Sequence, residues 1–196
     1  MSDLQPIVVS PYDPAWQAQG LALAAELRAE LAPLPLHVEH IGSTAIPGMA
    51  AKPVFDLQIS VTDLAEAERA FDGPLAAMGF RCSPYQRDHV PAGLDDDPGR
   101  WAKRLWLRRG QAGADCNLHV RLLGSPNERL ALLFRDWFRA HPEAVPAYAR
   151  FKTVLAGAVG DIDTYSDVKD PVVDLVITVA NSWAAATGWA PHSCLA

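Results

Sequence analysis

Residues 54–61 constrain the fold of this chain more than any other stretch, because apolar and polar side chains alternate strictly along them. One set of alternate positions is apolar and consists of Phe55, Leu57, Ile59 and Val61. The other set consists of Val54, Asp56, Gln58 and Ser60. A repeat of two residues predicts a β-strand with one buried face. Asp56 and Gln58 therefore project together from the opposite face, and the rest of the chain must supply the sheet around them.

A second strand and a glycine turn precede this strand. Residues 37–41 favour a short strand that ends at Gly42, where the missing Cβ lets backbone or a ligand approach closely. Ser43 and Thr44 then offer hydroxyl and amide groups. Turns of this kind bind phosphate because successive N–H groups converge on an anion, although a Gly-Ser-Thr tripeptide is more often a plain turn.

Helical periodicity and capping residues cover much of the remaining chain. Five helices are expected, beginning near Asp13, Asp63, Ser125, Pro142 and Asp170. The second contains Gly73-Pro74, which can kink or break it, and the fifth is expected to reach about Ala186. Residues 7–10 predict an edge strand, and residues 81–99 predict a loop. The sequence thus predicts an α+β fold with a mixed sheet packed by helices and a helical C-terminal region.

Two β-branched and aromatic runs predict a hairpin, formed by residues 101–109 and 116–123 around a turn at 110–115. Arg104, Trp106 and Arg108 share one face of the first arm, and Asn117, His119 and Arg121 share the polar face of the second. The simplest interpretation of these arginines is a solvated strand face. The acidic run at residues 95–97 is interpreted as a solvated loop, because consecutive acids do not share a strand face.

The polar faces can also be interpreted as one binding site. Gly42 and Ser43 would meet Asp56, together with the hairpin face that carries arginines and His119. Such a set could hold a metal-bound triphosphate, with Asp56 binding Mg²⁺, which prefers hard oxygen ligands. Arg104 and Arg108 would neutralise the phosphates. Phosphoryl or nucleotidyl transfer needs little beyond in-line positioning and charge stabilisation.

Length and charge limit the class of protein. The chain has 196 residues, which predicts a single domain over residues 1–188 followed by a loosely ordered tail at 189–196. Its net charge of −6 argues against non-specific nucleic-acid binding through a basic surface. Three cysteines without metal-like spacing favour a reducing cytoplasm. Neither a signal peptide nor a membrane span is predicted.

Several motifs resemble those of the GrpB family, which is assigned to the nucleotidyltransferase superfamily and is also found fused to dephospho-CoA kinases. They include PYDPAW, EHIGSTAIPG, KPVFDLQ, LHV and FRDWFRAHPE, beginning at residues 11, 39, 52, 118 and 134, and the late pair Tyr165 and Lys169. The resemblance covers nearly the whole chain. It implies a nucleotidyltransferase-like sheet with the Gly-Ser motif at Gly42-Ser43 and the first metal-binding acid at Asp56.

The chain departs from the superfamily pattern at one important place. Active nucleotidyltransferases carry a second acid two residues after the first and a third on a neighbouring strand. Here Gln58 occupies the second position and His119 is the candidate for the third, so a two-metal site of the usual kind is in doubt. Glu39 is a weak substitute, because alternation places it on the opposite face from His40 and Gly42. His40 and His119 remain candidates for a ligand, a phosphate donor, a general base or a structural role.

Three functions compete at this stage. The first is an Mg²⁺-dependent protein that binds a nucleotide triphosphate and transfers NMP to a small molecule or a protein. Asp56, Ser43 and His119 would be its catalytic residues, and its nucleotide-binding residues would be Gly42, Ser43, Thr44, Lys52, Arg104 and Arg108. The second is a noncatalytic nucleotide-binding or interaction module that assists a partner enzyme such as a dephospho-CoA kinase. The third is a metal-dependent phosphohydrolase that uses His40, Asp56 and His119. A homo-oligomer is compatible with each of them.

Overall fold

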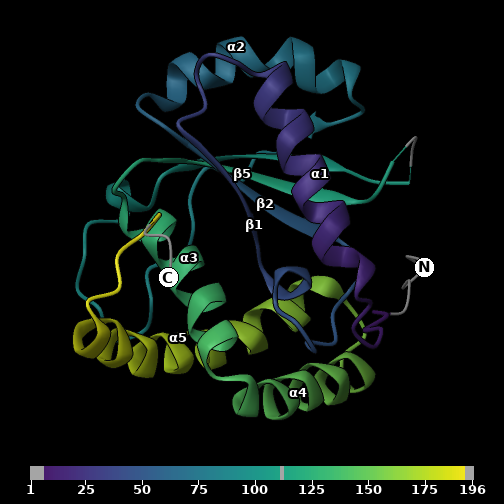
Figure 1. Ribbon diagram of the computed structural model, residues 1–196, viewed down its shortest axis with the longest axis vertical. Helices are drawn as coiled ribbons and strands as arrows, with labels where there is room; N and C mark the ends of the chain where they lie inside the picture. The colour runs from purple at the N-terminus through teal and green to yellow at the C-terminus, as the bar shows by residue number, and fades with distance from the viewer. Residues whose placement is uncertain (1–6, 111–112, 193–196) are drawn as a thin grey trace.

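The computed structural model describes residues 7–110 and 113–192, which form one five-stranded sheet with helices on both faces (Figure 1). The strands are β1 (His37–Ile41), β2 (Phe55–Val61), β3 (Arg81–Cys82), β4 (Lys103–Arg108) and β5 (Cys116–Leu122). The helices are α1 (Ala15–Glu30), α2 (Leu64–Ala77), α3 (Pro126–Ala140), α4 (Val145–Ala158) and α5 (Ile162–Thr187). Short 3₁₀ turns lie at Ser43–Ala45, Pro98–Trp101 and Pro142–Ala144. The predicted α+β architecture is confirmed.

The sheet is mixed, and its strand order is β1-β2-β5-β4-β3. The β2 and β5 strands are parallel, so Asp56 lies opposite Asn117 and Gln58 lies opposite His119. All other pairs are antiparallel, including the β4–β5 pair that was predicted as a hairpin. Residues 111–112 of its turn lie outside the described residues. The parallel register brings the polar positions of the two central strands side by side.

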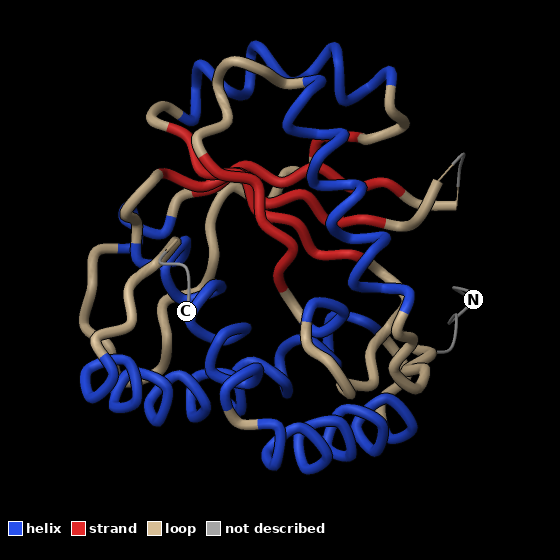
Figure 2. The backbone as a smooth tube through the Cα atoms, in the orientation of Figure 1, coloured by secondary structure: helices blue, strands red, loops and turns tan. Residues whose placement is uncertain are grey.

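Each face of the sheet has its own hydrophobic core. Figure 2 shows helices above and below the strands. The first core packs α1 and α2 on one face through Trp16, Leu27, Leu57, Ile59, Phe71 and Trp106. The second core joins the end of β1 to α3, α4 and α5 through Ile41, Met49, Phe138, Tyr148 and Ile177. The alternation of residues 55–61 therefore directs the apolar set to the first core and Asp56 to the side of α3–α5.

The predicted helix starts are confirmed for α2 but not for α5. Asp63 caps α2 by accepting hydrogen bonds from the backbone N–H groups of Ala65 and Glu66, at 2.7 and 2.9 Å, and the helix continues past Pro74. The predicted start of α5 at Asp170 is wrong, because Asp161 caps it nine residues earlier by accepting from Thr164 N at 2.8 Å. Pro171 lies inside α5 and has no backbone N–H, so the helix lacks one hydrogen-bond donor at this position but continues on both sides of it.

The two ends of the chain and the acidic run differ in how closely they follow the predictions. The edge strand at residues 7–10 is reduced to one bridge between Ser10 and Ala51. The predicted tail begins with Trp189 in a buried position and His192 bonded to Glu128 at 2.8 Å, and residues 193–196 lie outside the described residues. In the acidic run, Asp96 bonds Arg100 at 2.8 Å within the loop. Within the described parts of the chain, no helix is both long and apolar enough to cross a membrane.

Candidate functional site

Asp56 lies at the start of β2, on the face of the sheet that α3–α5 cover. Asn117 on the adjacent strand donates a hydrogen bond from Nδ2 to Asp56 Oδ1 at 2.6 Å, and His119 Nε2 lies 3.8 Å from the same oxygen. Burial alone would raise the pKa of Asp56, but His119 and Asn117 together hold that pKa below its usual value. Asp56 is therefore ionised at neutral pH.

Gly42 allows the end of β1 to pass directly against this carboxylate. Its φ is +69°, and a Cβ at this position would lie 2.4 Å from Asp56 Oδ2. Only glycine combines that backbone conformation with so close an approach. In the turn that follows, Ser43 lines the same cavity as Asp56.

A cavity of about 440 Å³ opens at this end of the sheet and extends between the strands and the C-terminal helices. Its sheet side is lined by Gly42, Ser43, Lys52, Asp56, Lys103, Asn117 and His119. Its helical side is lined by Leu130, Ala131, Phe134, Tyr148, Lys152, Tyr165, Lys169, Asp170 and Val173. The cavity thus has two lysines, Lys52 and Lys103, on its polar sheet side and two more, Lys152 and Lys169, on a helical side that is otherwise largely apolar and aromatic.

Lys152 is the most unusual of these lysines. Only 3% of its surface is exposed, and its Nζ donates a hydrogen bond to Ser43 Oγ at 2.7 Å. Among the described residues, no carboxylate lies within ion-pair distance of it. Burial, followed by the charges of Lys169 and Lys52 against that of Asp56, lowers the pKa of Lys152 to about 7. A buried ammonium without a counter-ion is costly, so this group is suited to meeting an anion.

The other three lysines differ in how far their charge is already matched. Lys52 Nζ lies 5.2 Å from the centroid of the Tyr165 ring, and burial lowers its pKa. Lys169 lies 3.5 Å from Asp170 on its own helix. Lys103 pairs with Asp88 at 2.6 Å and is therefore neutralised within the protein. The cationic groups available to a ligand are Lys52, Lys152 and Lys169.

His119 is a neutral donor rather than a base. Burial and then the charge of Arg121 lower its pKa to about 4. Its Nδ1 lies 3.3 Å from Arg121 Nη2, which can only donate, so Nδ1 accepts and the ring proton is on Nε2. That N–H points toward Asp56.

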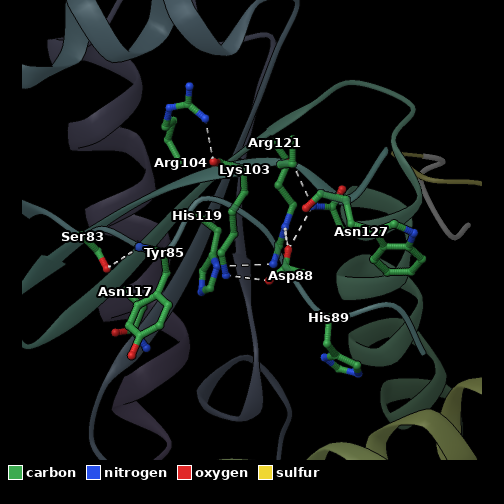
Figure 3. Close-up of polar contacts among 12 residues, drawn as sticks. Ser83, Tyr85, Asp88, His89, Lys103, Arg104, Asn117, His119, Arg121 and Asn127 are labelled. Atoms are coloured by element: carbon green, nitrogen blue, oxygen red, sulfur yellow. Dashed lines mark hydrogen bonds and ion pairs between the residues drawn. The ribbon is translucent and has the colours of Figure 1, made fainter. Parts of the chain in front are cut away.

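Gln58 does not contribute to the cavity. It is fully buried, and its Oε1 accepts from Arg121 Nη1 at 2.5 Å while its Nε2 donates to the carbonyl of Glu128 at 3.3 Å. Arg121 in turn pairs with Asp88 at 2.9 Å, and Figure 3 shows Asp88 between Arg121 and Lys103. The sequence did not point to Asp88, which comes from an irregular loop without a motif. Its network fixes Gln58 and orients His119.

The predicted placement of Arg104 and Arg108 is wrong. In the β4–β5 register, Arg104 lies opposite Val120 and Arg108 opposite Cys116, so both project from the face that α2 covers. Arg104 pairs with Glu68 at 2.6 Å, and in Figure 3 it extends away from the group around Asp88. Arg108 lies over the Phe80 ring with its guanidinium carbon 4.8 Å from the centroid. Lys103, one residue earlier, faces the cavity side instead.

Thr44 and His40 also lie outside the cavity. Thr44 is 1% exposed, and its hydroxyl is 2.9 Å from His40 Nε2 on the α1 side of the sheet. His40 is pressed against Gly20, and burial lowers its pKa to about 4. The site combining His40, Asp56 and His119 is therefore not assembled, because His40 and Asp56 belong to opposite faces.

The side chains present do not fit a resident Mg²⁺ well. Over the described ranges, no group of three His, Cys, Asp or Glu residues is placed to hold a metal. Two carboxylates, Asp56 and Asp170, line the cavity from opposite sides, and Lys52, Lys152 and Lys169 line it with them. Mg²⁺ is commonly held by one or two carboxylates together with substrate phosphates, whereas this set of charges selects for an anion.

The sequence contains one signal for the position of Lys152. Tyr148, Lys152 and Leu155 are spaced four and three residues apart, which places this lysine on the buried stripe of α4. A lysine on a buried stripe needs a specific partner. Lys169 was noted only through the family resemblance, and here it faces the same cavity as Lys152.

Comparison with known protein families matches residues 6–178 to the family model described as GrpB protein. A dephospho-CoA kinase of Mycolicibacterium paratuberculosis is 36% identical over 205 residues, covering 95% of this chain and 49% of that protein. A UPF0157 protein of Halalkalibacterium halodurans is 31% identical, covering 90% of this chain and 83% of its own length. The chain thus spans about half the length of the mycobacterial relatives.

A solved structure of the same family has a similar fold. The crystal structure of the conserved protein GrpB from Enterococcus faecalis superimposes with a TM-score of 0.71 and 27% sequence identity. The match covers 90% of this chain and 99% of that one. The five-stranded mixed sheet and its long C-terminal helix are therefore shared.

Proposed function

The chain belongs to the GrpB family, and we propose that it binds a nucleotide through its phosphates in the cavity between the sheet and helices α4 and α5. The observation that carries this proposal is Lys152, a buried lysine beside Ser43 without a carboxylate partner among the described residues. Charge-assisted hydrogen bonds to phosphate would compensate the burial of this group.

The two walls of the cavity suit the two parts of a nucleotide. The phosphates would contact Ser43 and the ammonium groups of Lys52, Lys152 and Lys169. The base and sugar would lie along the apolar wall, where Tyr165 offers an aromatic surface. A volume of about 440 Å³ is within the range typical of small-molecule sites.

Binding has stronger support than transfer of NMP. Gln58 supplies no second carboxylate, and its side chain is bonded to Arg121 and Glu128. His119 is a neutral donor with its Nε2–H toward Asp56, which makes it a group that orients rather than one that accepts a proton. In the proposed complex Asp56 would therefore position the ligand, together with Ser43 and Lys52.

Isothermal titration with ATP, GTP, CTP and UTP, each with and without Mg²⁺, tests the proposal. At least one nucleotide should bind, and Lys152→Met should weaken it by about 10–100-fold, the range expected for lost hydrogen bonds to a charged group. If Mg²⁺ takes part, it should increase the affinity, and Asp56→Asn should remove that increase. Absence of binding by all four nucleotides, or affinity unchanged in Lys152→Met, would reject the proposal.

A second candidate function follows from the lengths of the relatives. The chain matches about half of proteins named dephospho-CoA kinase, so it corresponds to one part of a larger enzyme in those organisms. We propose as an alternative that it assists such a kinase. Titration of the purified protein with the dephospho-CoA kinase of the same host should then show saturable binding, and no binding at micromolar concentrations would exclude it.

A further inference from the structure

Ser43 and Lys152 form a hydrogen-bonded pair in the lining of the cavity. The Ser43 Oγ to Lys152 Nζ distance is 2.7 Å, although the residues are 109 positions apart in the chain. Ser43 follows Gly42, whose positive φ turns the chain sharply at the end of β1, and its side chain lines the open cavity. A serine at a sharp turn after a strand, with a base behind it, is the arrangement of an activated nucleophile.

The surroundings of Lys152 favour its uncharged form in the free protein. Lys169 from α5 and Lys52 from the loop before β2 repel its charge, and Asp56 from β2 is the one opposing group among the causes of its pKa shift. Tyr148 on its own helix presents a ring, 5.2 Å from Nζ to the centroid, rather than an anion. An uncharged amine at 2.7 Å can accept the proton of the serine hydroxyl.

We propose that Ser43 is a nucleophile and Lys152 its general base, acting on an ester or thioester that carries an anionic group bound by Lys52 and Lys169. This goes beyond nucleotide binding, because it assigns covalent chemistry to the same cavity and requires no nucleotide. A carbonyl compound is preferred to a phosphate as the electrophile because its reacting group is uncharged and so does not itself favour the charged form of Lys152.

The reaction balances without any further reagent except water. Ser43 Oγ forms a bond to the carbonyl carbon, its proton passes to Lys152 Nζ, and the bond from that carbon to the leaving oxygen or sulfur breaks. The leaving group takes the proton from Lys152. Water then attacks the acyl-serine with Lys152 again as base, which releases the carboxylic acid and restores Ser43.

Labelling with a fluorophosphonate, followed by mass spectrometry of the intact protein and its peptides, tests the nucleophile directly. One adduct per chain at Ser43 is expected, and Ser43→Ala should abolish it. The labelling rate should rise between pH 6 and 8 with a midpoint near 7, where Lys152 loses its proton. Failure of Ser43 to react, or an equal rate in Ser43→Ala, would overturn the proposal.

Lys152→Arg separates this chemistry from nucleotide binding. Arginine keeps the positive charge but cannot be deprotonated in proteins, so labelling should fall at least about 100-fold. Nucleotide affinity is measured in the same variant, because an arginine can still donate hydrogen bonds to phosphate. Labelling at the native rate in Lys152→Arg would remove Lys152 as the base and leave the nucleotide proposal standing. In a folded Lys152→Arg variant, a fall in labelling together with loss of nucleotide binding would support Lys152 as the base and count against the nucleotide proposal.

Hydrolysis of two 4-nitrophenyl esters tests the anionic part of the substrate. The succinate monoester carries a carboxylate that the acetate ester lacks, so Lys52→Met should raise the KM for the succinate ester alone. An equal effect on both esters, or none on either, would contradict the role of Lys52 in binding the anionic group.

Discussion

Binding of a nucleotide should be accompanied by uptake of a proton at Lys152. In the free protein burial and the neighbouring lysines lower the pKa of this group to about 7. A phosphate beside Nζ favours the charged form and should move the pKa back toward the ordinary value of about 10.4. Binding and protonation are therefore thermodynamically linked.

The size of the effect follows from these two values. At pH 8, a group with a pKa of about 7 is roughly one-tenth protonated, so full protonation on binding takes up about 0.9 proton. At pH 7 the uptake should be about 0.5 proton, and at pH 6 about 0.1. Because the bound form has the higher pKa, affinity is greatest below pH 7. Above pH 7 it should fall by about tenfold per pH unit.

Titration calorimetry at pH 8 in Tris and in HEPES measures this uptake, since the observed heat varies with the ionisation enthalpy of the buffer in proportion to the protons exchanged. A terminal phosphate with its second pKa near 6 is already ionised at this pH and contributes little. Lys152→Met and Lys152→Arg should both show uptake near zero, and only the arginine variant should retain tight binding. Native uptake below about 0.3 proton, or equal uptake in Lys152→Met, would refute the assigned linkage.

Three other substitutions have distinct expected outcomes. Gly42→Ala should lower the melting temperature by roughly 3–8 °C in calorimetry. The alanine Cβ would clash with Asp56, and a left-handed backbone costs a residue with a Cβ about 1–2 kcal/mol. A change below about 1 °C would contradict the close approach of Gly42 to Asp56. Arg104→Met should leave nucleotide affinity within about twofold, whereas Lys52→Met should weaken it, because only Lys52 of the two faces the cavity. A larger loss of affinity in Arg104→Met than in Lys52→Met would show that the two residues are assigned to the wrong faces of the sheet. Asp88→Asn should cost about 3–5 kcal/mol in urea unfolding at pH 7, because it leaves Lys103 and Arg121 unpaired. The folded-state pKa of Asp88 is lowered, so this cost should shrink as pH falls below about 4, and a pH-independent cost would count against the ion pair.

The central part of the fold could be predicted from sequence because its signals are local. Strict alternation fixed the face on which Asp56 projects, and Gly42 marked the turn that passes over it. The start of α2 followed from Asp63 as its cap. These features depend on residues within one strand or one helical turn, where side-chain direction follows directly from backbone geometry.

The positions that could not be predicted depend on long-range register. Arg104 and Lys103 are neighbours on β4, and only pairing with β5 decides which one faces the cavity. A shift of one residue exchanges the two faces of a strand, so an error of this kind moves every assigned side chain. The position of Thr44 outside the cavity could not be predicted for a related reason, because the turn after Gly42 directs the Thr44 hydroxyl toward His40. Lys152 was missed because its partner Ser43 is remote in sequence.

The parallel pairing of β2 with β5 also affects how the chain folds as it is made. Ribosomes add about 5–20 residues per second, and 61 residues separate Asp56 from its partner Asn117, so one edge of β2 lacks its neighbour for roughly 3–12 seconds. An unpaired strand edge is a template for pairing with other chains. The rate at which residues 62–122 are made therefore sets how long this edge stays unpaired, although Lys103 is the one cavity lysine that lies in that segment.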